Sequence, residues 1–152
     1  MLFRKPHIED LKTLNAISIK SKQYWGYPMA WVEKWKNELT LDDHKLKEQN
    51  ILLVEVDSKV IGFCSIVEKP ENYEILHLWI LPDHIGKGIG KKLLSESINS
   101  FTYDTRPIIV EADPNAEPFY RSQGFITFEK IESFPPGRFL PVMKRDPKER
   151  GK

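Results

Sequence analysis

A glycine-rich segment that separates two different hydrophobic patterns constrains this chain more than any other feature. Gly86, Gly88 and Gly90 alternate with other residues between an apolar run, Ile75–Leu81, and an amphipathic run, Lys91–Phe101. The apolar run is typical of a buried strand, and the amphipathic run has the spacing of a helix. The sequence therefore predicts a strand, a glycine turn and a helix in direct succession.

A turn of this kind is suited to hold phosphate. Glycine adopts positive φ at little cost and lets the backbone approach a ligand closely. The unpaired amides of the first helical turn then point at whatever lies there, and the helix dipole favours an anion. Lys87, Lys91 and Lys92 add charge of the matching sign. We therefore expect a phosphate-bearing ligand at this turn.

Length and composition limit the remaining possibilities. The 152 residues, of which 40% are hydrophobic, suit one domain, which we assign to residues 1–145, with a disordered tail at 146–152. The 23 basic and 22 acidic residues nearly balance, so the bulk charge indicates neither nucleic acid nor a membrane surface as partner. The single Cys64 forms no internal disulfide, and we expect no metal site. Without a signal peptide or a long apolar stretch, we expect a soluble, cytoplasmic protein.

The hydrophobic patterns along the chain predict a mixed α+β fold. Asp57-Ser58 separates two strand patterns and indicates a hairpin turn. Predicted helices cover residues 8–17, 29–39, 91–101 and 115–122. Predicted strands cover residues 1–4, 50–56, 59–67, 72–81, 108–112, 125–132 and 138–143.

Several interpretations of the glycine turn compete. A P-loop requires a glycine five residues before Gly90 and Ser or Thr after Lys91, but Ile85 and Lys92 occupy those positions. A dinucleotide fingerprint requires a third glycine where Lys91 stands, although Glu111 follows about 20 residues on, as that motif asks. A purely structural turn is the remaining alternative when the turn is taken alone.

Two motifs together resemble the Gcn5-related N-acetyltransferase (GNAT) superfamily. The segment 85–90, Ile-Gly-Lys-Gly-Ile-Gly, is similar to its pyrophosphate turn, Gln/Arg-x-x-Gly-x-Gly/Ala, at both glycines, but Ile85 replaces the Gln or Arg. The segment Asp113–Phe125 is similar to its later motif, in which Asn115 opens a short helix and Phe-Tyr precedes Gly-Phe. The resemblance covers roughly residues 1–145.

The resemblance implies the GNAT acyl-CoA N-acyltransferase fold and acetyl-CoA as co-substrate. That fold has a mixed, mostly antiparallel sheet of six or seven strands, a splayed parallel pair, here ending near Leu81 and Ala112, and about four flanking helices. The pantetheine arm would enter between the splayed strands, and the pyrophosphate would bind the turn. The implied cofactor-binding residues are Leu78, Trp79, Ile80, Ile85, Gly86, Lys87, Gly88, Ile89, Gly90, Lys91 and Asn115. Helix capping is the alternative role for Asn115.

The implied reaction is acetyl transfer to a primary amine. A base removes a proton from the amine, and an acid gives one to the departing thiolate. Tyr120 occupies the family's general-acid position, with ring packing as its alternative role. Glu74 is the first candidate for the base, because it matches a glutamate that some family members use; His77 is its rival. A water chain could also remove the proton. Backbone N–H of Trp79 or Ile80 is the expected oxyanion donor.

The acceptor is an unidentified small-molecule or peptide amine. Tyr24, Trp25 and Tyr27 surround Gly26 in the region that forms the acceptor wall in this family, where they either line a pocket for a cation or flat group or simply pack. Arg138 either pairs with an acceptor carboxylate or is solvated.

Two other functions remain open. A CoA-binding module without transferase activity would keep the glycine turn and need no acid at Tyr120, and a nucleotide-binding protein would bind NAD instead. We also expect an exposed strand edge at residues 138–143, through which two copies of the chain could pair as a homodimer.

Overall fold

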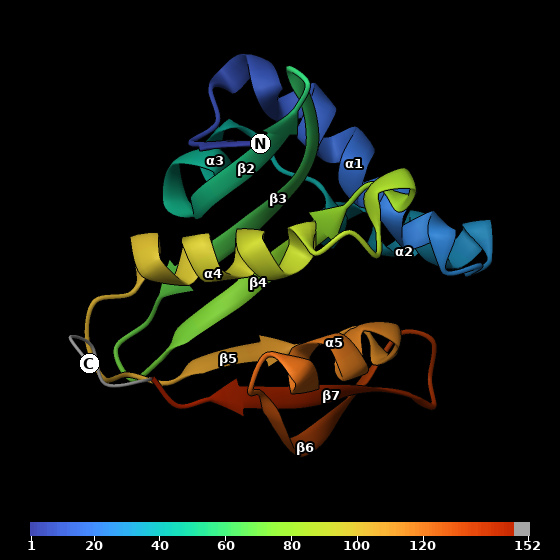
Figure 1. Ribbon diagram of the computed structural model, residues 1–152. Helices are drawn as coiled ribbons and strands as arrows, with labels where there is room; N and C mark the ends of the chain where they lie inside the picture. Colours follow the sequence, from blue (N-terminus) through green and yellow to red (C-terminus); the bar gives the residue numbers. More distant parts are fainter. Residues whose placement is uncertain (148–152) are drawn as a thin grey trace. The chain divides into compact units, whose positions relative to one another are not determined.

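The computed structural model describes residues 1–147. Runs of helices and runs of strands follow one another along the chain, as expected of an α+β fold (Figure 1). The strands are β1 (Leu2–Arg4), β2 (Asn50–Val56), β3 (Lys59–Glu68), β4 (Tyr73–Ile80), β5 (Ile108–Glu111), β6 (Ile126–Ser133) and β7 (Arg138–Arg145). The helices are α1 (Leu11–Tyr24), α2 (Met29–Leu39), α3 (Asp43–Glu48), α4 (Ile89–Phe101) and α5 (Glu117–Ser122).

The strands follow the order β1-β2-β3-β4-β5-β7-β6 in a sheet of seven. The β1–β2, β2–β3, β5–β7 and β6–β7 pairs are antiparallel, whereas β4 and β5 are parallel, from Tyr73 opposite Ile108 to Ile75 opposite Val110. The expected mostly antiparallel sheet with one parallel pair is therefore confirmed. The helix α3 was not predicted; its six residues are too few to show helical periodicity.

The expected dimer edge at residues 138–143 is wrong for Val142 and Met143, which pair with Glu111 and Val110 of β5. These residues belong to β7, which pairs with β5 on one side and with β6 on the other. In the observed strand order the outer positions belong to β1 and β6. The sequence pattern of β7 gives no sign of its two partners, because pairing partners lie far away along the chain.

The chain divides into two compact units. Among the described residues, unit 1 contains 1–66 and 77–101, and unit 2 contains 67–76 and 102–147. Strand β4 supplies its first half to unit 2 and its second half to unit 1. The assignment of residues 1–145 to one domain stays a prediction. Of the predicted tail, residues 148–152 lie outside the described residues.

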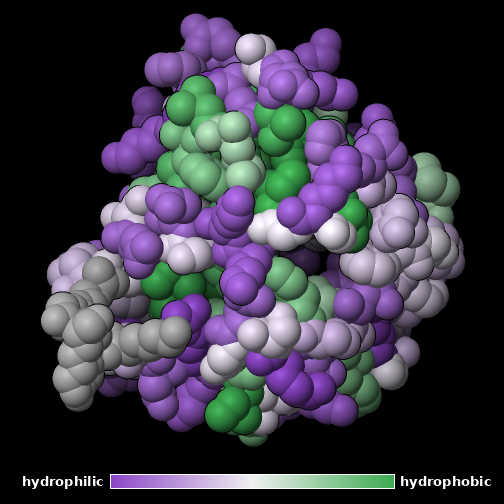
Figure 2. All heavy atoms as spheres, viewed as in Figure 1, coloured by the Kyte–Doolittle hydropathy of each residue, from purple (hydrophilic) through white to green (hydrophobic). Residues whose placement is uncertain are grey.

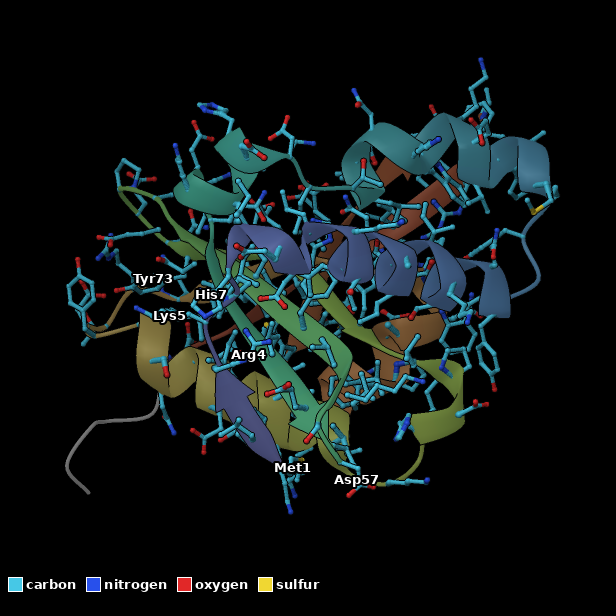
Figure 3. All side chains as sticks on the ribbon, turned by 90° about the horizontal axis from the view of Figure 1, so that it is seen from above. Met1, Arg4, Lys5, His7, Asp57 and Tyr73 are labelled. Carbon is cyan, nitrogen blue, oxygen red and sulfur yellow. The ribbon has the colours of Figure 1, made fainter. Side chains whose placement is uncertain are left out.

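In unit 1, helices cover both faces of β2 and β3. Leu14 and Ile17 of α1 pack with Ile51, Leu53 and Phe63 in one core cluster. Helix α4 lies on the opposite face of these strands (Figures 1 and 3) and buries Leu93, Leu94 and Ile98. Because both faces are covered, residues 51–54 of β2 are buried without interruption.

Two local features fix the N-terminal strands of unit 1. Asp57 and Ser58 both have positive φ, 52° and 64°, which is the backbone of a type I′ turn, and Asp57 marks the tip of the predicted β2–β3 hairpin (Figure 3). Arg4 of β1 donates to Asp10 at 2.9 Å and to Glu55 of β2 at 3.2 Å.

Apolar side chains gather on the visible surface over β1 and β2 (Figure 2), where Met1 and Leu2 are exposed.

In unit 2, one arginine fastens the beginning of β4 to the loop before β5. Arg106 donates to Glu68, Asp104 and the hydroxyl of Tyr73 at 2.7–3.1 Å, and its guanidinium lies 4.6 Å from the Tyr73 ring centroid. The Arg106 guanidinium holds the pKa of Asp104 at about 2. These contacts fix the start of the strand that leads towards the glycine turn.

Candidate functional site

The glycine turn lies in unit 1, directly before α4. Gly86 and Gly88 have φ of +84° and +77°, values that non-glycine residues rarely adopt. A Cβ atom at either position would meet no heavy atom within 4 Å, so the space over the turn is open. The predicted strand, turn and helix are all present, but α4 begins at Ile89 rather than at Lys91. Gly90 therefore lies within the helix instead of the turn.

The turn has the properties of an anion-binding site. The carbonyl of Gly88 accepts from the amide of Lys92 at 3.3 Å, which marks the first turn of α4. Amides at the start of a helix have no partner within that helix, and the dipole places partial positive charge there. Lys87, Lys91 and Lys92 are exposed around them. A phosphate at this position would find backbone donors and positive charge together.

The end of β4 is held by its neighbours in unit 1. The carbonyl of Ile80 accepts from the hydroxyl of Ser21 in α1 at 3.2 Å, and the amide of Leu81 donates to Ile61 at 2.8 Å. A Cβ on Gly62 would lie 2.5 Å from the carbonyl oxygen of Trp79, so only glycine permits this close approach of β3. The backbone of the predicted residues Leu78, Trp79 and Ile80 therefore follows a path that α1 and β3 fix.

The two candidate bases have different surroundings. His77 is buried, and its Nδ1 accepts from Nε1 of Trp79 at 3.0 Å. Burial lowers the pKa of His77 to about 4, so its imidazole is neutral near pH 7. Glu74 is half-buried and forms an ion pair with Lys69, and its carboxylate raises the pKa of that lysine.

Tyr120 lies in α5 of unit 2 and is 5% exposed. Its ring packs edge-on against Phe119 and Phe125, with centroid distances of 5.4 Å to each. The backbone carbonyl of Tyr120 accepts from the amide of Phe125 at 3.0 Å, which closes the turn after the helix. Both ring contacts are made without the hydroxyl group.

Asp113 organises the residues around the start of α5. Its Oδ1 accepts from the backbone amide and the side-chain amide of Asn115, at 2.8 and 3.0 Å. Asp113, rather than Asn115, is thus the capping residue. The Oδ2 atom of Asp113 lies 3.4 Å from Arg138, whose side chain is only 12% exposed. Arg138 is therefore an ion-pair partner within unit 2 and not a solvated side chain.

The predicted acceptor-side aromatics separate into two groups. Tyr24 and Trp25 are exposed and contact each other edge-on, with centroids 5.2 Å apart. Tyr27 instead packs against Trp31 and Trp35, with centroid distances of 6.0 and 5.0 Å. Only Tyr27 therefore joins the aromatic cluster formed with α2.

Sequence reasoning missed Lys22, which lies within this cluster. Its ammonium nitrogen is 4.6 Å from the Trp35 ring centroid and 5.2 Å from that of Tyr27. The signal was present in α1, where Leu14, Ser18 and Lys22 follow one another at intervals of four and are all buried. A lysine at a position that continues a buried stripe is unusual, so this spacing could have singled out Lys22 in the sequence.

Residues 1–147 lack two further classes of feature, a metal-binding cluster and a membrane-spanning helix. No group of three His, Cys, Asp or Glu side chains in that range could hold a metal ion. No helix in the same range combines the length and apolar character that crossing a membrane requires.

The fold and the turn define a class of protein, an α+β fold with a glycine turn of left-handed backbone between a central strand and a helix. A family model described as an acetyltransferase (GNAT) domain matches residues 13–143. The chain belongs to this family, as its two motifs had suggested.

Known proteins of the family resemble the chain in sequence and in structure. The spermidine N(1)-acetyltransferase of Thermoplasma acidophilum is 32% identical over 106 residues, which are 62% of this chain and 66% of that protein. The structure of PaiA N-acetyltransferase from Thermoplasma acidophilum, in complex with coenzyme A, has a TM-score of 0.75 and 25% identity and covers 95% of this chain and 98% of its own. A GCN5-related N-acetyltransferase from Rhodopseudomonas palustris has a TM-score of 0.76 at 21% identity, covers 95% and 94% of the two chains, and shows the shared fold alone.

Proposed function

We propose that this protein is an N-acetyltransferase that moves an acetyl group from acetyl-CoA to the primary amine of a small molecule or peptide. The observation that carries the proposal is the glycine turn, with Gly86 and Gly88 in left-handed conformations at the start of α4. It occurs in a chain of the GNAT family, and a structural neighbour was solved in complex with coenzyme A.

In this proposal the amides of residues 86–91 bind the pyrophosphate of acetyl-CoA. Ile85 is 44% exposed and has no side-chain donor, so backbone amides and the nearby lysines supply the binding energy. The backbone of residues 78–80 bonds to the pantetheine amides. Asn115, whose side-chain amide donates to Asp113, is the further side chain that we propose as a contact of the cofactor.

The reaction needs two proton transfers. The neutral amine attacks the thioester carbonyl. The carbonyl oxygen then receives a hydrogen bond from the backbone N–H of Trp79 or Ile80, and the carbon–sulfur bond breaks. Tyr120 supplies a proton to the departing thiolate, and the nitrogen loses one to a base or a water chain. We favour Glu74 over His77 as that base, because Glu74 matches a glutamate that some family members use and Nδ1 of His77 already accepts from Trp79.

The acceptor is proposed from chemistry and from one relative. Exposed Tyr24 and Trp25 and the more buried Tyr27 suit a cationic or flat acceptor. Because the Thermoplasma relative is named for spermidine, spermidine is tested as an acceptor beside simple monoamines. The contact of Arg138 with Asp113 supports a role in shaping unit 2 rather than in binding an acceptor carboxylate. A cytoplasmic location and a homodimer stay predictions.

Isothermal titration tests the cofactor. We expect saturable binding of acetyl-CoA and none of NAD or ATP under the same conditions. A thiol-release assay then screens spermidine, lysine, short peptides and simple alkylamines as acceptors. Binding with no release by any amine would favour a CoA-binding module, and selective binding of NAD would favour a nucleotide-binding protein. Absence of acetyl-CoA binding would remove the proposed role of the turn.

A further inference from the structure

The ammonium group of Lys22 lies among three aromatic rings in unit 1. Its Nζ atom is 4.6 Å from the ring centroid of Trp35, 5.2 Å from that of Tyr27 and 6.0 Å from that of Trp79. These rings come from α2, the loop before it and β4, and we call the three of them the aromatic cage. Trp35 and Tyr27 are edge-on at 5.0 Å, so the rings also support one another.

Packing alone does not account for a lysine at this position. Lys22 is 8% exposed, and lysine is almost never this buried without compensation for its charge. A leucine or methionine would occupy the same space without that desolvation penalty. The faces of aromatic rings attract cations, and tryptophan does so most strongly. The cage thus has the chemistry of an alkylammonium site, and a butylammonium group already lies in it.

The cage adjoins the proposed reaction strand. Trp79 belongs to β4, where residues 78–80 are proposed to hold the pantetheine arm, and its Nε1 atom is fixed by His77 at 3.0 Å. Tyr27 and Trp35 lie in the helical region that the family resemblance assigns to the acceptor. A cationic group bound in the cage would therefore be placed beside the strand at which acetyl transfer is proposed.

We propose that the aromatic cage is an alkylammonium-binding site that the chain closes with its own Lys22, and that Lys22 thereby restricts the acceptor. A diamine or polyamine carries a second ammonium group that would otherwise enter the cage; the Lys22 ammonium occupies that position and repels it. Monoamines carry no such second group. The selection of acceptors rests on the proposed function, whereas the existence of the cation site does not.

The cation site is tested by binding alone. Tetramethylammonium is titrated into wild type, Lys22→Ala and Lys22→Arg while tryptophan fluorescence is recorded. Lys22→Ala should bind it at least 10-fold more tightly than wild type, because truncation opens the cage. Lys22→Arg, which keeps a cation among the rings, should behave like wild type. Equal responses of all three proteins would overturn the site, whether or not the protein transfers acetyl groups.

The selection of acceptors is tested by kinetics. Lys22→Met keeps most of the side-chain volume without the charge and guards against misfolding of the alanine variant. The ratio of kcat/KM for spermidine to that for butylamine should rise at least 10-fold in Lys22→Met and in Lys22→Ala, and stay at the wild-type value in Lys22→Arg. An unchanged ratio in both neutral variants would show that Lys22 does not select the acceptor, and the fluorescence titration would still decide the site itself.

Discussion

The two aromatic contacts of the Tyr120 ring do not depend on its hydroxyl group. The ring is held edge-on by Phe119 and Phe125, and phenylalanine would keep both contacts. If the hydroxyl supplies the proton to the thiolate, Tyr120→Phe should lower kcat by about 10²-fold with little change in acetyl-CoA affinity. Steady-state thiol release and titration measure the two quantities. Tyr103→Phe, which loses a hydroxyl bonded to Glu68 instead, is the control and should retain full turnover.

His77 makes stability depend on pH. Its pKa falls from 6.5 to about 4 on burial, so between these values the unfolded chain binds more protons than the folded one. Stability is therefore complete above pH 6.5 and decreases as the pH falls towards 4. Between pH 7.5 and pH 5 we expect a loss of about 2 kcal/mol from this residue, measured by urea unfolding. His77→Asn, which can still accept from Trp79, should lack this part of the loss; an identical pH profile would contradict the assignment.

A substitution in the glycine turn should weaken acetyl-CoA binding without unfolding the protein. In Gly88→Asp the side chain has open space, but its carboxylate competes with phosphate for the same amides and the backbone resists φ of +77°. Acetyl-CoA affinity should therefore fall at least about tenfold, while the protein remains folded by circular dichroism. Gly137→Asp imposes a similar backbone demand, at φ of +89°, in the turn between β6 and β7. The Gly137→Asp variant should bind acetyl-CoA with the wild-type affinity.

The β2–β3 hairpin offers a stabilising substitution, because two residues with side chains occupy left-handed positions there. Ser58 has φ of 64°, at the second central position of the turn, where glycine is preferred. The left-handed conformation costs a non-glycine residue roughly 1–2 kcal/mol, and glycine loses part of that gain through greater unfolded-state entropy. We expect Ser58→Gly to raise the free energy of unfolding by about 0.5–1 kcal/mol at constant m value. Ser58→Ala, which keeps the unfavourable φ, should show no gain.

Local patterns predicted what depends on neighbouring residues. The Asp57-Ser58 hairpin, the strand before the turn and the helix after it were all recognisable, because alternation, helical spacing and glycine act over a few residues. Features that depend on contacts between distant segments were not recognisable in the sequence. The two partners of β7 and the burial of Lys22 among rings from α2 and β4 depend on contacts between distant segments. Likewise, the sequence placed His77 among the bases, whereas its burial and its bond to Trp79 set its pKa.

Cofactor binding should be visible in the stability of the whole protein. A ligand that binds only the folded state stabilises it by about 2.7 kcal/mol at a free concentration of 100 times its Kd. For a chain of 152 residues this corresponds to a rise in Tm of roughly 5–10 °C. Acetyl-CoA should produce this shift, NAD should not, and Gly88→Asp should reduce the shift to about half or less at the same acetyl-CoA concentration. Because both units share β4, we expect the shift in one cooperative transition, followed by tryptophan fluorescence and far-ultraviolet circular dichroism together. Two separate transitions, of which only one moved with acetyl-CoA, would show instead that the units unfold independently and that the cofactor binds one of them.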